Sequence, residues 1–301
     1  HYGWDVGRTP FGGRKSCGFS WHEMRLDADL AALSEAGVDL VRVFLLSDLR
    51  TGVILDDAGA VGGLDACVER DLASFVAAAR RHGLRVMPVL IDFLVADGVE
   101  DRELGPGEDM IWSEGEHPEL LMGAKKRQSF LDRAIKPLVR EIARLQRLHG
   151  NIHSIDIANE IGNAKAVVTP DGFTELKEFV RECARVIAAE APGIPATLGT
   201  RDRSDLVRYW WDVELGLRQF HFYDDFAEGG LALAYPRTCL GFEEDVLAGE
   251  VDPTGDVAAK LETVRQNGYR GILFWSFHER DGFRIDLDAI KRWKARATAT
   301  G

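Results

Sequence analysis

The chain has 301 residues, and its 37 Lys and Arg residues against 49 Asp and Glu residues give a formal net charge of −12. This acidic balance argues against a nucleic-acid-binding surface. Apolar residues make up 46% of the chain and charged residues 29%, and there is no long uncharged apolar run, so the composition indicates a globular protein rather than a disordered or membrane-spanning one. The length fits either two domains of ordinary size or one large domain.

The ends and the cysteines of the chain carry little information about its location. No basic segment followed by an apolar stretch begins the chain, so no signal peptide is predicted within it, and both secretion and a cytoplasmic location stay open. The four cysteines are widely spaced and form no C-x-x-C pair, so their spacing indicates no metal site and leaves a Cys17–Cys67 disulfide open. We expect a monomer that binds neither membrane nor nucleic acid.

Short apolar, β-branched runs alternate with longer helical patterns along the whole chain. The predicted strands, in order, are 2–6, 40–46, 84–91, 152–158, 196–199, 217–222, 238–242 and 271–275. The predicted helices are 27–36, 64–82, 127–149, 174–190, 204–212, 256–267 and 287–296. Parallel strands need such crossover helices, so the pattern predicts a single (β/α)8 barrel over residues 1–301. An open, doubly wound sheet is disfavoured because no nucleotide-binding glycine motif follows an early strand.

The carboxyl ends of barrel strands are where active sites lie, and these positions follow from the predicted strands. They are Arg42 within strand two, Asp92 and Phe93 after strand three, Asn159 and Glu160 after strand four, Thr200 and Arg201 after strand five, His221 and Tyr223 at strand six, Glu243, Glu244 and Asp245 after strand seven, and Trp275 to His278 at strand eight. The long loops 47–63, 93–126 and 159–172 are expected on the same face.

Two carboxylates stand out among these positions, one after strand four and one after strand seven. Strands about half a barrel apart can point two side chains across one mouth. Hydrolysis of a glycoside needs such a pair, because one carboxyl donates a proton to the leaving oxygen while the other attacks or activates water. Mutual repulsion between two close carboxylates holds their pKa values apart, which suits these opposite roles.

The run Ile155-Asp156-Ile157-Ala158-Asn159-Glu160 resembles the strand-four Asn-Glu signature of glycoside hydrolase clan A. These are the retaining (β/α)8 glycosidases that include the family 5 cellulases and mannanases. The Val41-Arg42-Val43 strand resembles the strand-two arginine of that family, His221-Phe222-Tyr223 its strand-six His-x-Tyr, and Phe274-Trp275-Ser276 its strand-eight tryptophan. The resemblance covers essentially the whole chain in order and spacing.

The resemblance implies a role for each matching residue. Glu160 is the implied general acid/base, and Asn159 the residue that hydrogen-bonds the sugar hydroxyl next to the reacting carbon. Arg42 and Tyr223 would orient the nucleophile and keep it ionised. His221 would support the acid/base, and Trp275 would form the stacking floor under the sugar whose bond breaks.

The nucleophile position departs from the family pattern. The family usually has Gly-Glu followed by an aromatic residue and Gly, whereas this chain has Gly241-Phe242-Glu243-Glu244. Strand alternation lets only one of the two glutamates face inward, and Glu243 is favoured, with Glu244 as the alternative. A second departure lies at strand three, where Asp92-Phe93 replaces the Asp-x-His of many family 5 members, so Asp92 is a candidate substrate contact of unfamiliar type.

Tryptophans near the predicted cleft are candidate sugar platforms, because sugars present apolar C–H faces that stack on aromatic rings. Trp21 and Trp112 are the main candidates beside Trp275, and Trp4 is a further one.

The sequence therefore predicts a retaining β-glycoside hydrolase that cleaves β-linked glucan- or mannan-type oligo- or polysaccharides by double displacement, with no cofactor or metal. Two alternatives stay open. A non-catalytic carbohydrate-binding barrel would explain the irregular nucleophile motif. A metal-dependent barrel hydrolase would need clustered ligands, and His22-Glu23 and His278-Glu279 lack the second histidine of a zinc motif.

Overall fold

The computed structural model describes residues 1–2, 18–49, 52–97, 117–164, 169–223, 231–279 and 282–299. Its main sheet has seven parallel strands in the order β1-β4-β5-β6-β7-β8-β9. They are β1 (Leu40–Phe44), β4 (Arg85–Asp92), β5 (Ile155–Asn159), β6 (Ala196–Thr200), β7 (Arg218–Phe222), β8 (Val246–Val251) and β9 (Gly271–Phe274). Nearly every residue of these strands is shielded from solvent, which is why they appear in the sequence as continuous apolar runs.

Residues 1–2 occupy the place of the eighth strand, between β1 and β9. The amide of Tyr2 donates to the carbonyl of Arg42 on β1 at 3.0 Å, and the amide of Phe277, just after β9, donates to the carbonyl of His1 at 2.9 Å. The architecture is therefore the predicted (β/α)8 barrel. Of the predicted first strand, 2–6, only Tyr2 falls within the described residues.

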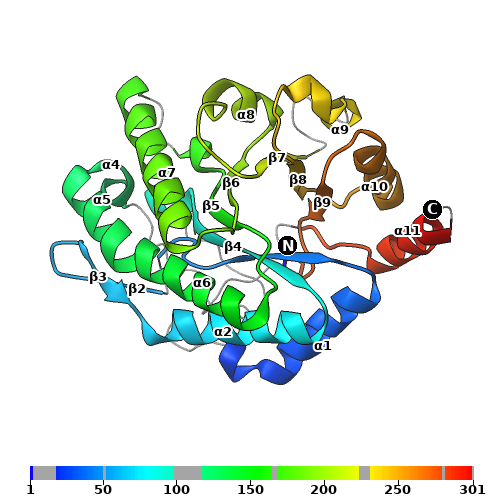
Figure 1. The fold of residues 1–301 in the computed structure, drawn as a ribbon, viewed down its shortest axis with the longest axis horizontal. Coiled ribbons are helices and arrows are strands. Elements are labelled where there is room, and N and C mark those ends of the chain that lie inside the picture. Colours follow the sequence, from blue (N-terminus) through cyan, green and yellow to red (C-terminus); the bar gives the residue numbers. More distant parts are fainter. Residues whose placement is uncertain are drawn as a thin grey trace.

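Helices surround the strands (Figure 1). The longer ones are α1 (Glu23–Glu35), α2 (Ala66–Arg81), α6 (Lys136–His149), α7 (Pro170–Glu190), α10 (Val257–Gln266) and α11 (Leu287–Ala299), with the shorter α8 (Arg203–Tyr209) between β6 and β7. Side-chain caps begin several of them: Asp65 accepts from the amides of Cys67 and Val68 at the start of α2, and Thr169 caps α7. None of the helices among the described residues combines the length and the apolar character needed to cross a membrane.

Shorter elements fill the connections. Part of the predicted loop 47–63 forms an antiparallel hairpin of β2 (Val53–Leu55) and β3 (Val61–Leu64). The others are η1 (Phe19–Trp21), α3 (Leu94–Asp97), α4 (Glu119–Met122), α5 (Ala124–Phe130), η2 (Leu131–Ile135), η3 (Ile161–Asn163), α9 (Leu231–Ala234) and η5 (Arg237–Leu240). Cys67 is disulfide-bonded, Cys183 and Cys239 are free, and Cys17 lies outside the described residues.

The barrel interior is layered, because residues two apart on a strand face the same side. Met87, Leu217, Leu247 and Leu273 form an apolar cluster at the amino ends of the strands. Phe44, Val89 and Trp275 form a second apolar cluster nearer the carboxyl ends. On β1, Arg42 lies between Leu40 of the lower cluster and Phe44 of the upper one, so a charged residue is enclosed between two apolar layers.

The predicted strand 238–242 is wrong. Residues 238–240 belong to the 3-10 turn η5, which ends at its cap Gly241 with a φ of 74°, and the strand begins only at Val246. Pro236 precedes η5, and Cys239 within it is exposed, whereas all six residues of β8 are buried. Glu243 and Glu244, which were expected to follow the seventh barrel strand, therefore precede β8.

Candidate active site

Arg42 is the centre of a buried polar network inside the barrel. Its side chain is fully buried, so the cost of removing a charge from water has to be offset by close partners. Nε donates to Asp156 at 2.9 Å, Nη1 to Glu250 at 2.9 Å and Nη2 to the Oδ1 atom of Asn159 at 2.9 Å. Burial opposes the charge of Arg42, but the two carboxylates outweigh it and raise the pKa of the guanidinium.

Glu250 lies near the end of β8, directly across from His221 in the register with β7. The Tyr223 hydroxyl donates to its Oε1 atom at 2.5 Å, and Arg42 donates to Oε2. The His1 ring also lies against it, with Nε2 3.0 Å from Oε2. Burial alone would raise the pKa of Glu250, but the charges of His221 and Arg42 and the hydrogen bonds from Tyr223 and Arg42 lower it below the ordinary value. The surroundings of this carboxylate therefore keep it ionised.

Glu160 follows β5 and has a different environment. Its backbone is in the left-handed region at φ 43°, a conformation that costs a residue with a side chain free energy and that recurs at functional sites. The Nδ1 atom of His221 lies 2.7 Å from Oε1, and Asn163 Nδ2 donates to Oε2 at 2.6 Å. Its side chain is 13% exposed, against 7% for Glu250. Glu160 is thus the more accessible carboxyl of the two.

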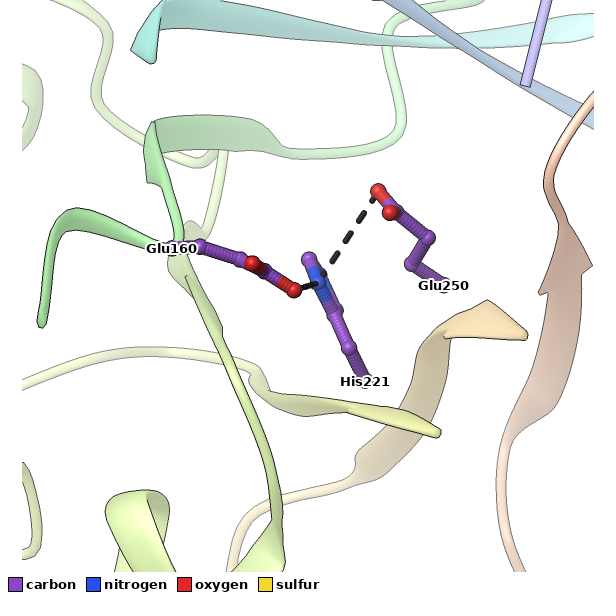
Figure 2. Close-up of side chains that lie close together, drawn as sticks. All are labelled: Glu160, His221 and Glu250. Carbon is purple, nitrogen blue, oxygen red and sulfur yellow. Dashed lines mark hydrogen bonds and ion pairs between the residues drawn. The ribbon is translucent and has the colours of Figure 1, made fainter. Parts of the chain in front are cut away.

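The two carboxyl groups face each other across the imidazole of His221 (Figure 2). The His221 Nδ1 atom is 3.8 Å from Glu250 Oε2, and one ligand-type atom from each of Glu160, His221 and Glu250 lies within 4.8 Å of the others. Among the described residues this is the one cluster with three potential metal ligands. Arg42 already neutralises Glu250 and its positive charge opposes a cation there, so the geometry favours acid–base and nucleophilic chemistry over metal binding.

Asp92 and Asn159 are register partners at the ends of the neighbouring strands β4 and β5. Asn159 Nδ2 donates to Asp92 Oδ2 at 3.0 Å, and the amide of Leu94 donates to Asp92 Oδ1 at 3.0 Å. Burial raises the pKa of Asp92 well above its usual range, and the negative charges of Glu160 and Glu250 raise it further. The hydrogen bonds from Leu94 and Asn159 act in the opposite direction but do not cancel the effect of burial.

Trp275 follows β9 and is buried, with its ring centroid 6.1 Å from that of Phe44. Tyr223 packs on the same cluster. The structure thus brings together seven of the residues predicted from strand ends, Arg42, Asp92, Asn159, Glu160, His221, Tyr223 and Trp275. Trp4 and Trp112 lie outside the described residues, as does the side chain of Trp21, whose backbone is part of η1.

Glu243 and Glu244 do not join this group. Both precede β8 and therefore lie at its amino end, opposite the mouth that holds Glu160. The carboxylate of Glu244 accepts from Arg218 Nη2 at 2.9 Å, and Arg218 is the first residue of β7. Their expected position after strand seven is wrong because that strand lies later in the chain than predicted.

Glu250, Asp156 and Gln219 are site residues that the sequence reasoning missed. Gln219 Nε2 donates to Asp156 at 2.7 Å, and the Gly199 amide donates to the same carboxylate at 3.0 Å, which fixes the partner of Arg42. A side chain at Gly249 would approach Gln219 Oε1 to 2.1 Å, so glycine is needed before Glu250. The dipeptide Gly249-Glu250 was the available signal, because it matches the Gly-Glu of the family pattern better than Gly241-Phe242-Glu243 does.

Comparisons with known proteins find the same architecture. No family model and no curated protein matches the chain. The β-mannanase from the blue mussel Mytilus edulis is 17% identical, with a TM-score of 0.71 over 91% of this chain and 84% of its own. The β-1,4-mannanase from the sea hare Aplysia kurodai is also 17% identical, with a TM-score of 0.73 over 97% and 88%.

A further solved structure is GH5_18 from Streptomyces cattleya in complex with GlcNAc. It is 14% identical, with a TM-score of 0.66 over 100% of this chain and 80% of its own. The fold of this chain is therefore the (β/α)8 barrel of these glycosidases, as the resemblance in the sequence implied.

Proposed function

We propose that the protein is a retaining β-glycoside hydrolase in which Glu250 is the nucleophile and Glu160 the general acid/base. One observation carries this proposal: two carboxyl groups from opposite sides of the barrel mouth converge on His221, with one oxygen of each within 4.8 Å of the other. Retaining glycosidases hold their two carboxyl groups about 5–5.5 Å apart, whereas inverting enzymes need about 6.5–9.5 Å to admit a water molecule.

The environments of the two carboxyls suit the two roles. Glu250 receives hydrogen bonds from Arg42 and Tyr223 that stabilise its negative charge, as a nucleophile requires. Glu160 sits at the more open position and contacts His221 Nδ1, through which a proton can be shared. In the first step, Glu250 attacks the anomeric carbon while Glu160 protonates the leaving oxygen. In the second step, Glu160 deprotonates a water molecule that displaces Glu250.

The substrate class rests on resemblance. Two of the similar solved structures are β-mannanases, so β-1,4-mannan is the first polysaccharide to assay, followed by β-glucans and chromogenic β-glycosides. The reason for a non-catalytic barrel was the irregular motif around Glu243, and that reason no longer applies once Glu250 stands at the end of the seventh barrel strand.

The nucleophile is tested by covalent trapping. A 2-deoxy-2-fluoro β-glycoside activated by a dinitrophenyl leaving group should inactivate the enzyme, and peptide mass spectrometry should find the sugar on Glu250. A label on Glu243 or Glu244 would overturn the assignment, and binding of sugar without any label or turnover would favour the non-catalytic reading.

The acid/base is tested by the dependence of the rate on the leaving group. Glu160→Gln should lower kcat/KM on mannan or an alkyl glycoside by about 10²–10⁴-fold, the usual contribution of a positioned proton donor. It should lower the first step much less on a dinitrophenyl glycoside, whose leaving group needs no proton. An equal loss on both substrates would contradict the role of Glu160.

A further inference from the structure

Asp92 lies in the candidate active site, but the proposed mechanism assigns it no role. It is buried at the end of β4, yet its two oxygens are both engaged, one by the Leu94 amide and the other by the side-chain amide of Asn159. The strand register places Asp92 directly beside Asn159, and the Phe93 amide donates to the Asn159 carbonyl at 3.1 Å. The backbone thus holds the two side chains in a fixed relation.

The side chain of Asn159 is held from two sides by groups of opposite hydrogen-bonding character. Arg42 has only donors, so the atom that faces its Nη2 must be the carbonyl oxygen of the Asn159 amide. Asp92 Oδ2 then accepts one of the two N–H groups on the other side. A rotation of the amide by 180° would set donor against donor at Arg42 and lose both bonds, so the orientation is specified twice.

One N–H of Asn159 remains for the substrate. In the part of the chain that the structure describes, Nδ2 donates to Asp92 and to no other protein group. Asn159 is buried among its neighbours but keeps 6% of its surface exposed, and it immediately precedes Glu160. We propose that Asp92 is a positioning residue that aims the second N–H of Asn159 at the sugar hydroxyl next to the reacting carbon, and so sets the preference for substrates that carry this hydroxyl.

This inference rests on the proposed glycosidase function, and it gives that site a determinant of specificity. Hydrogen bonds to the 2-hydroxyl strengthen in the transition state of glycoside hydrolysis, so the aim of a single N–H affects the rate. The carboxyl group of Asp92 is suited to the task because each of its two oxygens accepts from one of the two donors. An asparagine at position 92 has one acceptor oxygen and one NH2 group, so in either orientation a donor faces a donor, at the Leu94 amide or at Asn159, and the contact that holds Asn159 is disturbed.

The decisive experiment compares Asp92→Asn with the unchanged enzyme on a matched pair of aryl β-glycosides, one with the 2-hydroxyl and one 2-deoxy. We expect kcat/KM to fall about tenfold on the first substrate and less than about twofold on the second, because only the first can use the Asn159 N–H. In an Asn159→Ala background, Asp92→Asn should have no further effect on the ratio. Equal losses on both substrates, or no loss on either, would overturn the proposal.

Asp71→Asn is the matched control. Asp71 is another fully buried acid, on α2, and its carboxylate accepts from the amides of Gly18, Phe19 and Ser20, in and just before η1. This variant should lower the melting temperature and leave the ratio between the two substrates unchanged. A change of ratio in Asp71→Asn would mean that the ratio reports general destabilisation, and would overturn the proposal.

A second readout does not depend on catalysis. In ¹⁵N-labelled protein, the two side-chain amide protons of Asn159 should differ, with one shifted downfield by Asp92, and Asp92→Asn or Asp92→Ala should remove that shift. An unchanged pair of signals would overturn the positioning role. If the enzyme cleaves no glycoside, the proposed function fails, and these signals still decide whether Asp92 holds Asn159.

Discussion

Two arginine–glutamate pairs flank β8, and only one of them is a candidate for catalysis. At the amino end, Arg218 pairs with Glu244 at 2.9 Å, and at the carboxyl end Arg42 pairs with Glu250 at 2.9 Å. Burial raises the pKa of both glutamates, yet each pKa lies below its ordinary value. Hydrogen bonds and the charge of Arg218 lower the pKa of Glu244, and the charges of His221 and Arg42 lower the pKa of Glu250. A stabilised carboxylate beside an arginine is therefore not by itself a sign of catalysis.

The pairs differ in what else surrounds the carboxylate. Glu244 is 32% exposed, whereas Glu250 is 7% exposed and also receives the Tyr223 hydroxyl. Glu250 faces His221 and, beyond it, a second carboxyl on Glu160. A nucleophile needs an acid partner within reach, and Glu250 has one in Glu160, at the carboxyl ends of the strands. Both glutamates pair with an arginine, so it is their position along β8 that distinguishes the candidate nucleophile Glu250 from the structural residue Glu244.

The largest loss of activity is expected when the glutamate of the carboxyl-end pair, Glu250, is neutralised. Glu250→Gln keeps the shape of the side chain but removes the attacking charge, so kcat should fall by at least about 10³-fold, the scale seen when a nucleophile is lost. Glu244→Gln and Glu243→Gln should stay within about twofold, because a partly exposed ion pair contributes little. Steady-state rates on one aryl glycoside provide the measurement, and near-normal turnover by Glu250→Gln would contradict its assignment.

The sequence predicted the strands that appear as apolar runs with plain ends, and it misplaced the seventh barrel strand, which is Val246–Val251 and not 238–242. Arg42, Asn159, Glu160, His221, Tyr223 and Trp275 all follow from apolar runs whose ends are plain in the sequence. Glu250 does not, because the seventh strand was predicted to end at residue 242. Even with β8 placed correctly, Leu247 faces the interior and simple alternation would turn position 250 outward. The register with β7 shifts between Ala248 and Glu250, so that Glu250 stands opposite His221.

The residue at this irregularity, Gly249, meets a side chain from outside β8. Such shifts re-aim side chains next to active sites. Gly249 is confined to glycine by Gln219 on β7, a contact that no pattern within residues 246–251 reveals. Asp156 was hidden for a similar reason, because it meets Arg42 and Gln219 only once β1, β5 and β7 are placed in the barrel.

A smaller loss of activity is expected when Arg42 is displaced while both carboxylates are left unchanged. A Cβ atom at Gly199 on β6 would lie 2.8 Å from Arg42 Nη2 and 3.1 Å from His221 Nε2, so Gly199→Ala must displace one of them. We expect about a tenfold to hundredfold loss of kcat/KM, because a displacement of about 1 Å in a positioned group has effects of that order.

Gly271→Ala on β9 is the control for this variant, because its added Cβ would lie 3.4 Å from Leu247 Cδ2, an ordinary contact. Equal kinetics in Gly199→Ala and Gly271→Ala, with both proteins folded by circular dichroism, would show that the position of Arg42 and His221 does not limit the reaction.

The smallest effect is expected when Glu250 loses the hydrogen bond from the Tyr223 hydroxyl, a bond that has no counterpart at Glu244. Tyr223→Phe deletes the donor 2.5 Å from Oε1, so the lowered pKa of Glu250 should rise towards its ordinary value. Glu250 reacts only when ionised, and activity is lost as the pH falls through its pKa. The acidic limb of the kcat/KM profile should therefore move to higher pH in Tyr223→Phe. Tyr269→Phe, which removes a hydroxyl bonded to the neutral carbonyl of Tyr235, should leave that limb in place, and a limb that moves to lower pH or stays fixed in Tyr223→Phe would show that Tyr223 does not hold the charge of the nucleophile.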